Sequence, residues 1–410
     1  MARETYRRGS INCYLDRIRG YLIQATPEEA VRQDTVDWLM GDLGFPAERL
    51  RTEFNQRRRG ASGRSDVIAF APGADDEFGE ALMVVECKRP GVLLDDRVRD
   101  QAIRYATPLE AKLIVLTNGE ERIAYARRRG EWTRIERVPS WKALLKGERL
   151  RWAPEEQFLR WQFRDIATVE AARRTIQEQG LRNWFIGEDS PDALAPFALN
   201  LLGLLADGTH PIAVPIRSGD IVVERDLGQR SRSFGNHAGG VWASRYYRSF
   251  LVRSARKKSY DVVSLTVLAQ AKVTGHALWG TRRGRTMLIA AVDDGASSHI
   301  SLEMGLDETF VAGGRAMTIA HSGAMTVGRR GAVKRELVRE QLAVHGAGDL
   351  VRGDKIVLGE LPHGVELAWE STAPFVGNVI RYALARDRIR AGLTDAPRMS
   401  ARVNSQKQVQ

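Results

Sequence analysis

The chain has few cysteines, no long apolar run and no histidine near its N-terminus. Only two cysteines, Cys13 and Cys87, occur among 410 residues. That number excludes a disulfide scaffold and suits a reducing compartment. No apolar run approaches the ~18–20 residues that cross a bilayer, and residues 1–20 lack the apolar segment of a signal peptide. We therefore expect a cytoplasmic protein that does not bind a membrane.

All seven histidines lie beyond residue 200. Zinc sites and catalysis by a Ser-His or Cys-His pair are therefore excluded for the first 200 residues. Carboxylates acting with a hard cation such as Mg²⁺ remain available there. The phosphate-binding loop G-x-x-x-x-G-K-[ST] is also missing, because residues 280–286 (GTRRGRT) do not fit it. The chain is thus not expected to contain an ATP-driven motor.

Positive charge is in excess, with 62 lysines and arginines against 51 acidic residues and a net charge of +11. A soluble protein this basic often binds a polyanion, and nucleic acid is the leading candidate. The length and the 43% hydrophobic content indicate two or three globular domains. We predict a first domain over residues 1–150, a helical connector over 151–205, a β-rich domain over 206–390 and a disordered tail over 391–410.

The first domain shows an α/β pattern. Thr26 and Pro27 are typical of a helix start, and the two acids that follow suit the positive end of a helix. A second helix is predicted over 98–109, and strands are predicted over 50–56, 66–70, 81–88, 112–117 and 123–128. Beyond residue 210, short β-rich runs alternate with glycine and polar turns, which favours a mainly β sandwich or barrel. The predicted fold class is therefore a mixed α/β sheet flanked by helices, followed by a β-rich domain.

Three polar residues stand at the ends of two predicted strands. Glu86 and Lys88 end a strand that begins with the apolar run ALMVV, and Asp66 begins the preceding strand. Because side chains alternate along a strand, Glu86 and Lys88 share one face, and pairing of the two strands would bring Asp66 beside Glu86. Two carboxylates and a lysine can hold Mg²⁺ or Mn²⁺ and hydrolyse a phosphodiester. A salt bridge at the rim of the domain is the alternative interpretation of Glu-x-Lys.

The first domain resembles the N-terminal nuclease domain of type I restriction enzyme R subunits, in the PD-(D/E)xK superfamily. The resemblance covers residues 20–130 and rests on an ordered set of segments. They are TPEEAVRQ (26–33), GFP (44–46), RSDVIAF (64–70), VVECKRP (84–90), QAIRYA (101–106) and IVLTNG (114–119). It implies a restriction-endonuclease-like sheet and a role in restriction or antiviral defence. No family is recognised for the rest of the chain.

The resemblance also implies roles for single residues. Asp66 and Glu86 would be metal ligands, Lys88 the catalytic lysine, and Glu29, or less directly Glu28, a helix acid that supports the metal. Gln101 and Tyr105 match a Gln-x-x-x-Tyr pattern that positions DNA or the lysine. The basic segment formed by Arg57, Arg58, Arg59 and Arg64 either contacts phosphates or is a solvated hairpin tip.

The function predicted from these features is metal-dependent hydrolysis of DNA by an endonuclease that forms a homo-oligomer. One alternative is a catalytically silent protein of the same fold that binds nucleic acid or a ligand. Another is an effector nuclease gated by a small-molecule or phage-derived trigger at the β-rich domain. His321, in the β-rich domain, lies near a glycine in the sequence AHSGAM. It either contacts a ligand or has a structural role. Aromatic residues over 242–250 are either core or a stacking surface for bases.

Overall fold

The computed structural model describes residues 3–55, 64–73, 78–154, 158–236, 240–255, 259–276, 280–293, 295, 298–309, 316–327 and 331–395. Two compact units make up the chain, Met1–Glu156 and Gln157–Gln410. The predicted phosphate-contacting residues Arg57, Arg58 and Arg59 lie outside the described residues. The α/β class of the first unit and the β-rich character of the second are both confirmed.

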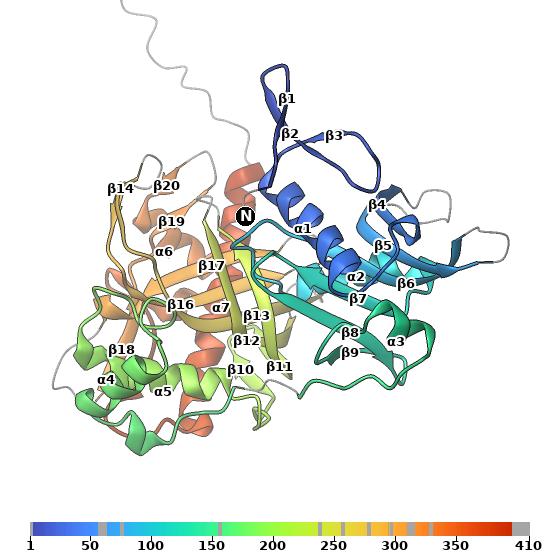
Figure 1. Cartoon of the computed structure of the whole chain (residues 1–410). Coiled ribbons are helices and arrows are strands. Elements are labelled where there is room, and N and C mark those ends of the chain that lie inside the picture. The colour runs from blue at the N-terminus through green and yellow to red at the C-terminus, as the bar shows by residue number, and fades with distance from the viewer. Residues whose placement is uncertain are drawn as a thin grey trace, which may run out of the picture. The chain divides into compact units, whose positions relative to one another are not determined.

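The first unit is built on a six-stranded mixed sheet in the order β4-β5-β6-β7-β8-β9 (Figure 1). Strands β6 and β7 are parallel, and the other neighbours are antiparallel. A parallel pair needs a crossover, which here contains helix α2 (Asp96–Ala106). The strands are β4 (Leu50–Asn55), β5 (Arg64–Pro72), β6 (Phe78–Cys87), β7 (Leu113–Thr117), β8 (Arg122–Arg128) and β9 (Glu131–Ile135).

Helices cover both faces of this sheet. One face packs with α1 (Pro27–Gly41) over a core that includes Val67, Val85 and Cys87, and the other packs with α2 (Asp96–Ala106) over Ile68 and Val84. Strand β6 therefore buries both of its faces, which explains its continuous apolar sequence. The 3₁₀ turns Ala47–Arg49 and Thr107–Leu109 and the short helix α3 (Trp141–Leu145) complete the layers.

The start of α1 follows from its sequence. The Thr26 hydroxyl accepts a hydrogen bond from the backbone N–H of Glu29 at 3.1 Å, as an N-cap should. Before this helix, β1 (Tyr6–Arg8), β2 (Ile11–Leu15) and β3 (Leu22–Gln24) form a small antiparallel sheet that protrudes from the unit (Figure 1).

The second unit contains a six-stranded sheet in the order β10-β11-β12-β13-β16-β17. A further pairing of Gly235 in β11 with His299 in β17 closes the strands from β11 to β17 into a ring, so the sheet is barrel-like. Its strands are β10 (Ile216–Ser218), β11 (Ile221–Gly235), β12 (Val241–Ser254), β13 (Ser259–Ala269), β16 (Thr286–Asp293) and β17 (Ser298–Gly305).

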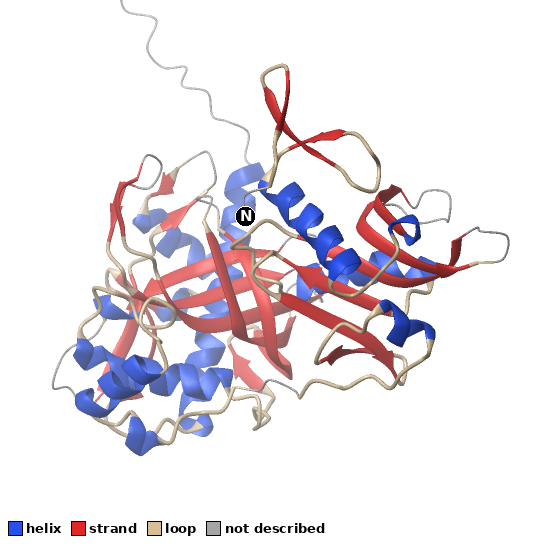
Figure 2. Ribbon diagram, viewed as in Figure 1, coloured by secondary structure: helices blue, strands red, loops and turns tan. Residues whose placement is uncertain are grey.

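Smaller sheets and helices surround the ring (Figure 2). The β-elements are β14 (Val273–His276), β15 (Gly280–Arg282), β18 (Ala316–His321), β19 (Met325–Thr326), β20 (Ala332–Val333), β21 (Val351–Arg352) and β22 (Lys355–Pro362). The α-helices are α4 (Val169–Glu178), α5 (Ala195–Ala206), α6 (Arg335–Val344) and α7 (Trp369–Asp395). Short 3₁₀ turns are Phe163–Asp165, Asp192–Leu194, Leu306–Glu308 and Gly348–Leu350.

Two segments of the second unit differ from the sequence-based expectation. The segment over 158–205, expected as a connector, packs α4 and α5 into the same core as the barrel strands. Helix α7 continues to Asp395, beyond the point where a tail is predicted, and the residues after it lie outside the described set.

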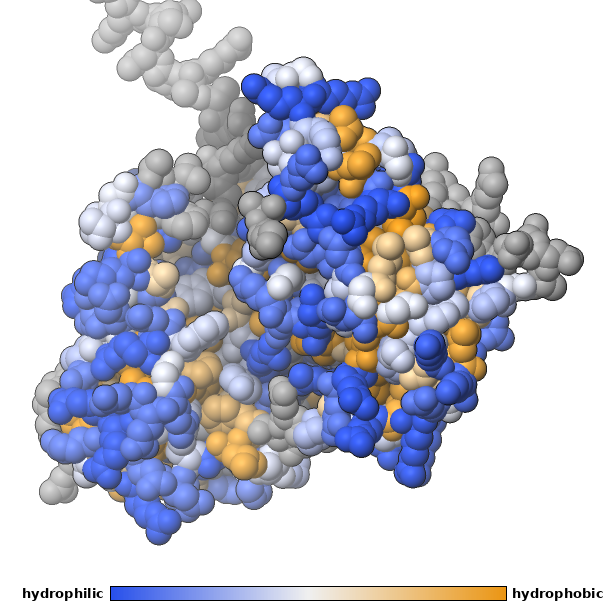
Figure 3. Space-filling model, viewed as in Figure 1, coloured by the Kyte–Doolittle hydropathy of each residue, from blue (hydrophilic) through white to orange (hydrophobic). Residues whose placement is uncertain are grey.

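The surface in view is mostly hydrophilic, with hydrophobic residues in small separate groups (Figure 3). None of the described helices has the length and hydropathy required of a bilayer-spanning segment. The aromatic residues Trp242, Tyr247 and Phe250 are buried. The core interpretation of this stretch is therefore confirmed, and a base-stacking surface is excluded for these three side chains.

Candidate active site

The antiparallel pairing of β5 with β6 brings Asp66 beside Glu86. Val67 faces Val85 in the register, so the next positions along the two strands are Asp66 and Glu86. An oxygen of Asp66, Oδ2, accepts a hydrogen bond from the backbone N–H of Cys87 at 2.8 Å. Both carboxylates are buried, with Asp66 9% and Glu86 2% exposed. The juxtaposition expected from the sequence is confirmed.

Glu86, Lys88 and Gln101 form one hydrogen-bonded cluster. Glu86 Oε1 accepts from Lys88 Nζ at 2.6 Å and from Gln101 Nε2 at 2.6 Å. The amide oxygen of Gln101 accepts from Lys88 Nζ at 3.3 Å. Tyr105, one turn further along α2, lies with its hydroxyl 3.5 Å from Gln101 Nε2. The helix therefore fixes the orientation of both the carboxylate and the lysine, although no side chain of α2 carries charge into the cluster.

The electrostatics of the cluster are dominated by Glu86. Burial, followed by the nearby charge of Asp66, raises the pKa of Glu86 to about 7, although Lys88 opposes the shift. Burial by itself would lower the pKa of Lys88, but the charge and hydrogen bond of Glu86 raise it overall. Lys88 is therefore protonated at neutral pH. Glu86 Oε2 is buried and has no hydrogen-bond partner among the described residues.

Arg32 belongs to the site and was missed by the sequence interpretation. Its guanidinium donates to Asp66 Oδ1 at 2.8 Å and also to Glu29 Oε2. The other oxygen of Glu29 accepts from Gln33 Nε2 at 2.9 Å. Glu29 is 3% exposed and burial raises its pKa. Its spacing of three residues from Arg32 on one helix is the signal that could have indicated the pair.

Glu53 was also missed, and it lies opposite Asp66 on the third strand of the site. The register pairs Thr52 with Val67 and Phe54 with Ser65, which places Glu53 across from Asp66. Its φ of 49° is the left-handed conformation that non-glycine residues rarely adopt, and such strain is typical of functional sites. The Glu53 carboxylate forms ion pairs with Arg19 at 3.0 Å, Arg32 at 3.1 Å and Arg64 at 3.0 Å.

A cavity of about 460 Å³ lies beside the start of α1 and strand β4. Glu29, Arg32 and Glu53 line it, together with Arg64 and Arg89. The Arg64 side chain is 62% exposed, and Arg89 is exposed as well. Two arginines therefore reach solvent at the cavity that Glu29 and Glu53 line. The predicted position of Arg64 next to the acidic cluster is therefore observed.

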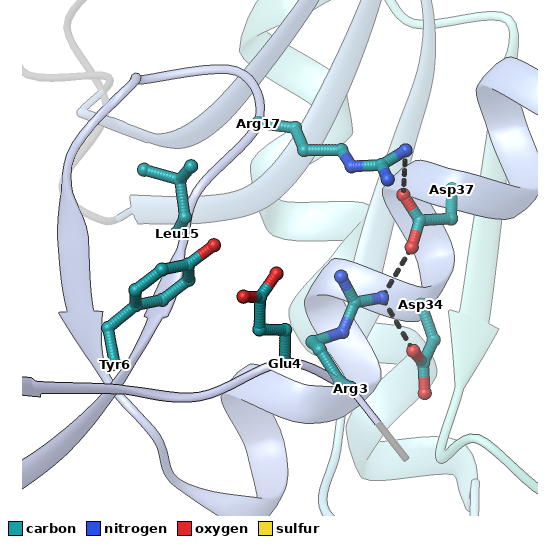
Figure 4. Close-up of a pocket in the computed structure, with 7 residues that line it drawn as sticks. All are labelled: Arg3, Glu4, Tyr6, Leu15, Arg17, Asp34 and Asp37. Atoms are coloured by element: carbon teal, nitrogen blue, oxygen red, sulfur yellow. Dashed lines mark hydrogen bonds and ion pairs between the residues drawn. The ribbon is translucent and has the colours of Figure 1, made fainter. Parts of the chain in front are cut away.

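Ion pairs hold the N-terminal segment against α1, the helix that carries Glu29 and Arg32. Arg3 donates to Asp34 at 2.7 Å and to Asp37 at 2.5 Å, and Arg17 lies 3.0 Å from Asp37 (Figure 4). These groups line a cavity of about 370 Å³. Arg3 and Arg17 are neutralised by Asp34 and Asp37. We therefore interpret these ion pairs as a structural contact that holds the N-terminal segment on α1, and not as a binding site.

The residues of the site fit a divalent cation held by two carboxylates. Within the described ranges, no three His, Cys, Asp or Glu side chains gather closely enough to hold a metal ion. Mg²⁺ requires only one or two carboxylates because it retains water ligands. The unpartnered Oε2 of Glu86 beside Asp66 suits this arrangement. Both oxygens of Glu29 accept from Arg32 and Gln33, and both oxygens of Asp66 accept from Arg32 and the Cys87 N–H, so the roles of these two acids as metal ligands stay predictions.

Comparison with known proteins finds one family model that matches part of the first unit. Residues 27–139 match the model of the family described as type I restriction enzyme R protein N terminus. The first unit thus contains an R-protein N-terminal-like domain. The resemblance expected from the sequence is confirmed for this domain, and the match does not extend into the second unit. No curated protein and no solved structure matches the chain.

Proposed function

We propose that the N-terminal domain is a nuclease that hydrolyses phosphodiester bonds of DNA with Mg²⁺ or Mn²⁺. The observation that supports this most directly is the convergence of Asp66, Glu86 and Lys88, with one buried oxygen of Glu86 left without a partner. Buried ionisable groups cost folding free energy, so a cluster that serves only stability would not be expected to leave a carboxylate oxygen unsatisfied. The family match to restriction enzyme R proteins points to the same nuclease-related class.

Each residue of the cluster has a role that follows from its contacts. Asp66 and Glu86 would hold the cation, which when bound polarises a phosphate oxygen and lowers the pKa of a bound water. Protonated Lys88 supplies positive charge for the phosphate as negative charge develops on it. Gln101 holds Glu86 and Lys88 in one orientation, and Arg32 does the same for Asp66.

DNA is proposed as the substrate because exposed arginines line the cavity that Glu29 and Glu53 also line. The chain carries a net charge of +11, and Arg64 and Arg89 line the cavity beside Glu29 and Arg32. Arginines of this kind bind backbone phosphates regardless of sequence. A role in restriction of foreign DNA and action as a homo-oligomer belong to the same proposal. The family match supports the role in restriction.

The proposal is tested by plasmid cleavage with the full chain, comparing wild type with two lysine variants. Lys88→Ala removes the cation of the cluster. Lys112→Ala is the matched control, because Lys112 directly precedes β7 and its 57% exposed side chain pairs only with exposed Glu80 among the described residues. We expect Mg²⁺-dependent cleavage by wild type and by Lys112→Ala, and a loss of about 10²–10³-fold for Lys88→Ala.

The other outcomes separate the alternatives. Equal cleavage by Lys88→Ala and wild type would show that the cluster is not the catalytic centre. Binding of DNA without cleavage, at every divalent cation tried, would support the catalytically silent protein of the same fold. Cleavage that appears only after a trigger is added would favour the gated effector.

A further inference from the structure

A cavity of about 300 Å³ lies within the second unit, apart from every residue assigned to hydrolysis above. Its wall includes Arg386 and Arg390 of α7, Arg282 of β15, Glu303 of β17 and His321 of β18. This volume is at the lower end of the range for small-molecule sites. The chemistry of the two α7 arginines indicates what the cavity would bind.

Arg386 is only 4% exposed but retains unused donors. Its Nε donates to the carbonyl of Ser301 at 2.8 Å, and its Nη1 donates to the carbonyl of Ala324 at 3.0 Å and to the hydroxyl of Tyr382 at 3.2 Å. Its Nη2 donates to none of the residues that the structure describes, and none of their carboxylates forms an ion pair with it. A buried guanidinium without a counter-ion is costly, so a ligand anion would be favoured here.

Arg390, one turn further along α7, is 5% exposed and is weakly compensated. Its Nε donates to the carbonyl of Thr326 at 3.2 Å, and its Nη2 to that of Ser301 at 3.2 Å. Its carboxylate partner Asp387 is 3.4 Å from Nη1 and is shared with His299. Burial and the charge of Arg386 lower the pKa of Arg390 to about 10, which still leaves the Arg390 guanidinium charged at neutral pH.

The remaining charges of the wall do not neutralise this pair. Glu303 contributes the carboxylate of the wall, and its Oε1 accepts hydrogen bonds from Asn236 at 2.5 Å and from Trp242 at 2.7 Å. His321 is neutral, because burial lowers its pKa to about 3. Its Nδ1 accepts from the backbone N–H of Gly323 at 3.1 Å and lies 2.7 Å from the Tyr382 hydroxyl, which places the ring proton on Nε2.

We propose that this cavity binds a small phosphorylated molecule, no larger than a nucleoside monophosphate, with its phosphate on Arg386 and Arg390. The unused Nη2 of Arg386 and the remaining N–H groups on Nη1 and Nη2 of Arg390 can donate charge-assisted hydrogen bonds to phosphate oxygens. The three arginines Arg282, Arg386 and Arg390 exceed the two nearby carboxylates, Glu303 and Asp387, by one positive charge, so a phosphomonoester with about −1.5 to −2 charges would be attracted to the cavity. Ile300, Ala324 and Met325 line the same cavity and provide apolar contact for the uncharged part of the ligand.

The test measures binding of inorganic phosphate, ribose 5-phosphate and AMP to the full chain by calorimetry, with EDTA present and adenosine as the uncharged control. Arg282→Ala removes a half-buried cation of the wall. Arg283→Ala is the matched control, because Arg283 is the exposed neighbour of Arg282 in the chain and does not line the cavity. Arg386→Lys keeps the charge but loses the guanidinium geometry. We expect AMP or ribose 5-phosphate to bind, with affinity at least about tenfold weaker in Arg282→Ala and in Arg386→Lys.

Unchanged affinity in Arg283→Ala, together with no binding of adenosine, would support the proposal. It is overturned if none of the three phosphate compounds binds, or if adenosine binds as tightly as AMP. It is also overturned if Arg282→Ala and Arg386→Lys both bind like wild type, because the phosphate would then be held elsewhere, such as at the N-terminal site.

Discussion

The raised pKa of Glu86 makes the stability of β6 depend on pH in a direction opposite to that of most carboxylates. The pKa is about 7 in the folded protein and 4.5 as the ordinary value. Between these values the native state binds more protons than the unfolded state, so stability falls as pH rises. The difference between these two pKa values corresponds to about 3 kcal/mol of stability, of which about 2–3 kcal/mol is lost between pH 5 and pH 8.

The perturbation is Glu86→Gln, which keeps the shape and the hydrogen bond to Lys88 but removes the titration. The assay is hydrogen exchange of the β6 peptide in EDTA at pH 5 to 8, corrected for intrinsic exchange rates, which gives the opening free energy of that strand. We expect the wild-type opening free energy to fall by about 2–3 kcal/mol more than that of the variant over this range. Glu80→Gln, on the same strand but exposed, is the control and is expected to follow wild type.

The comparison cancels the titration of the groups that do not interact with Glu86, because they are common to the wild type and the variant. If the wild type and Glu86→Gln give parallel curves, the carboxylate is not desolvated as its 2% exposure implies. The assignment of an unsatisfied, cation-seeking oxygen to Glu86 would then be wrong.

Three further outcomes are expected. Mn²⁺ or Mg²⁺ should increase hydrogen-exchange protection of β6 in wild type, and Asp66→Asn should abolish this increase. If the cation increases protection equally in the wild type and in Asp66→Asn, Asp66 does not hold the cation. Arg32→Met should destabilise the N-terminal domain by about 3–5 kcal/mol in thermal or urea unfolding, because it removes the ion-pair partner of buried Glu29 and Asp66. Arg104→Met, on the exposed side of α2, is the control and should change the free energy of unfolding little. Cys87 should resist iodoacetamide at pH 7.5 until urea is added, because burial raises the pKa of its thiol and excludes the reagent; labelling of the folded protein would contradict its 0% exposure.

Much of the site could be predicted from the sequence because its residues are tied to short-range patterns. The alternation of a strand places Glu86 and Lys88 on one face, and the apolar run before them indicates a buried strand. A hairpin between neighbouring strands then brings Asp66 to Glu86 without long-range information. The spacing of Gln101 and Tyr105 on one helix follows from the helical repeat.

Residues whose role depends on distant contacts could not be identified in this way. Arg32 appears in the sequence as one more helix arginine, and only the packing of α1 against the sheet brings it to Asp66. Glu53 requires a left-handed backbone within a strand, which no local pattern predicts for glutamate.

The sequence alone determined the α/β order, the strand ends that carry the three polar residues, and the absence of histidine chemistry from the N-terminal domain. These follow from periodicity and composition, which act over a few residues. Only the tertiary structure decided which cations neutralise which acids, and it buried Arg386 beside a cavity of the second unit with no carboxylate partner among the described residues. The physical reason is that burial and pairing depend on elements far apart in the chain, and these two properties set the charge that a site can bind.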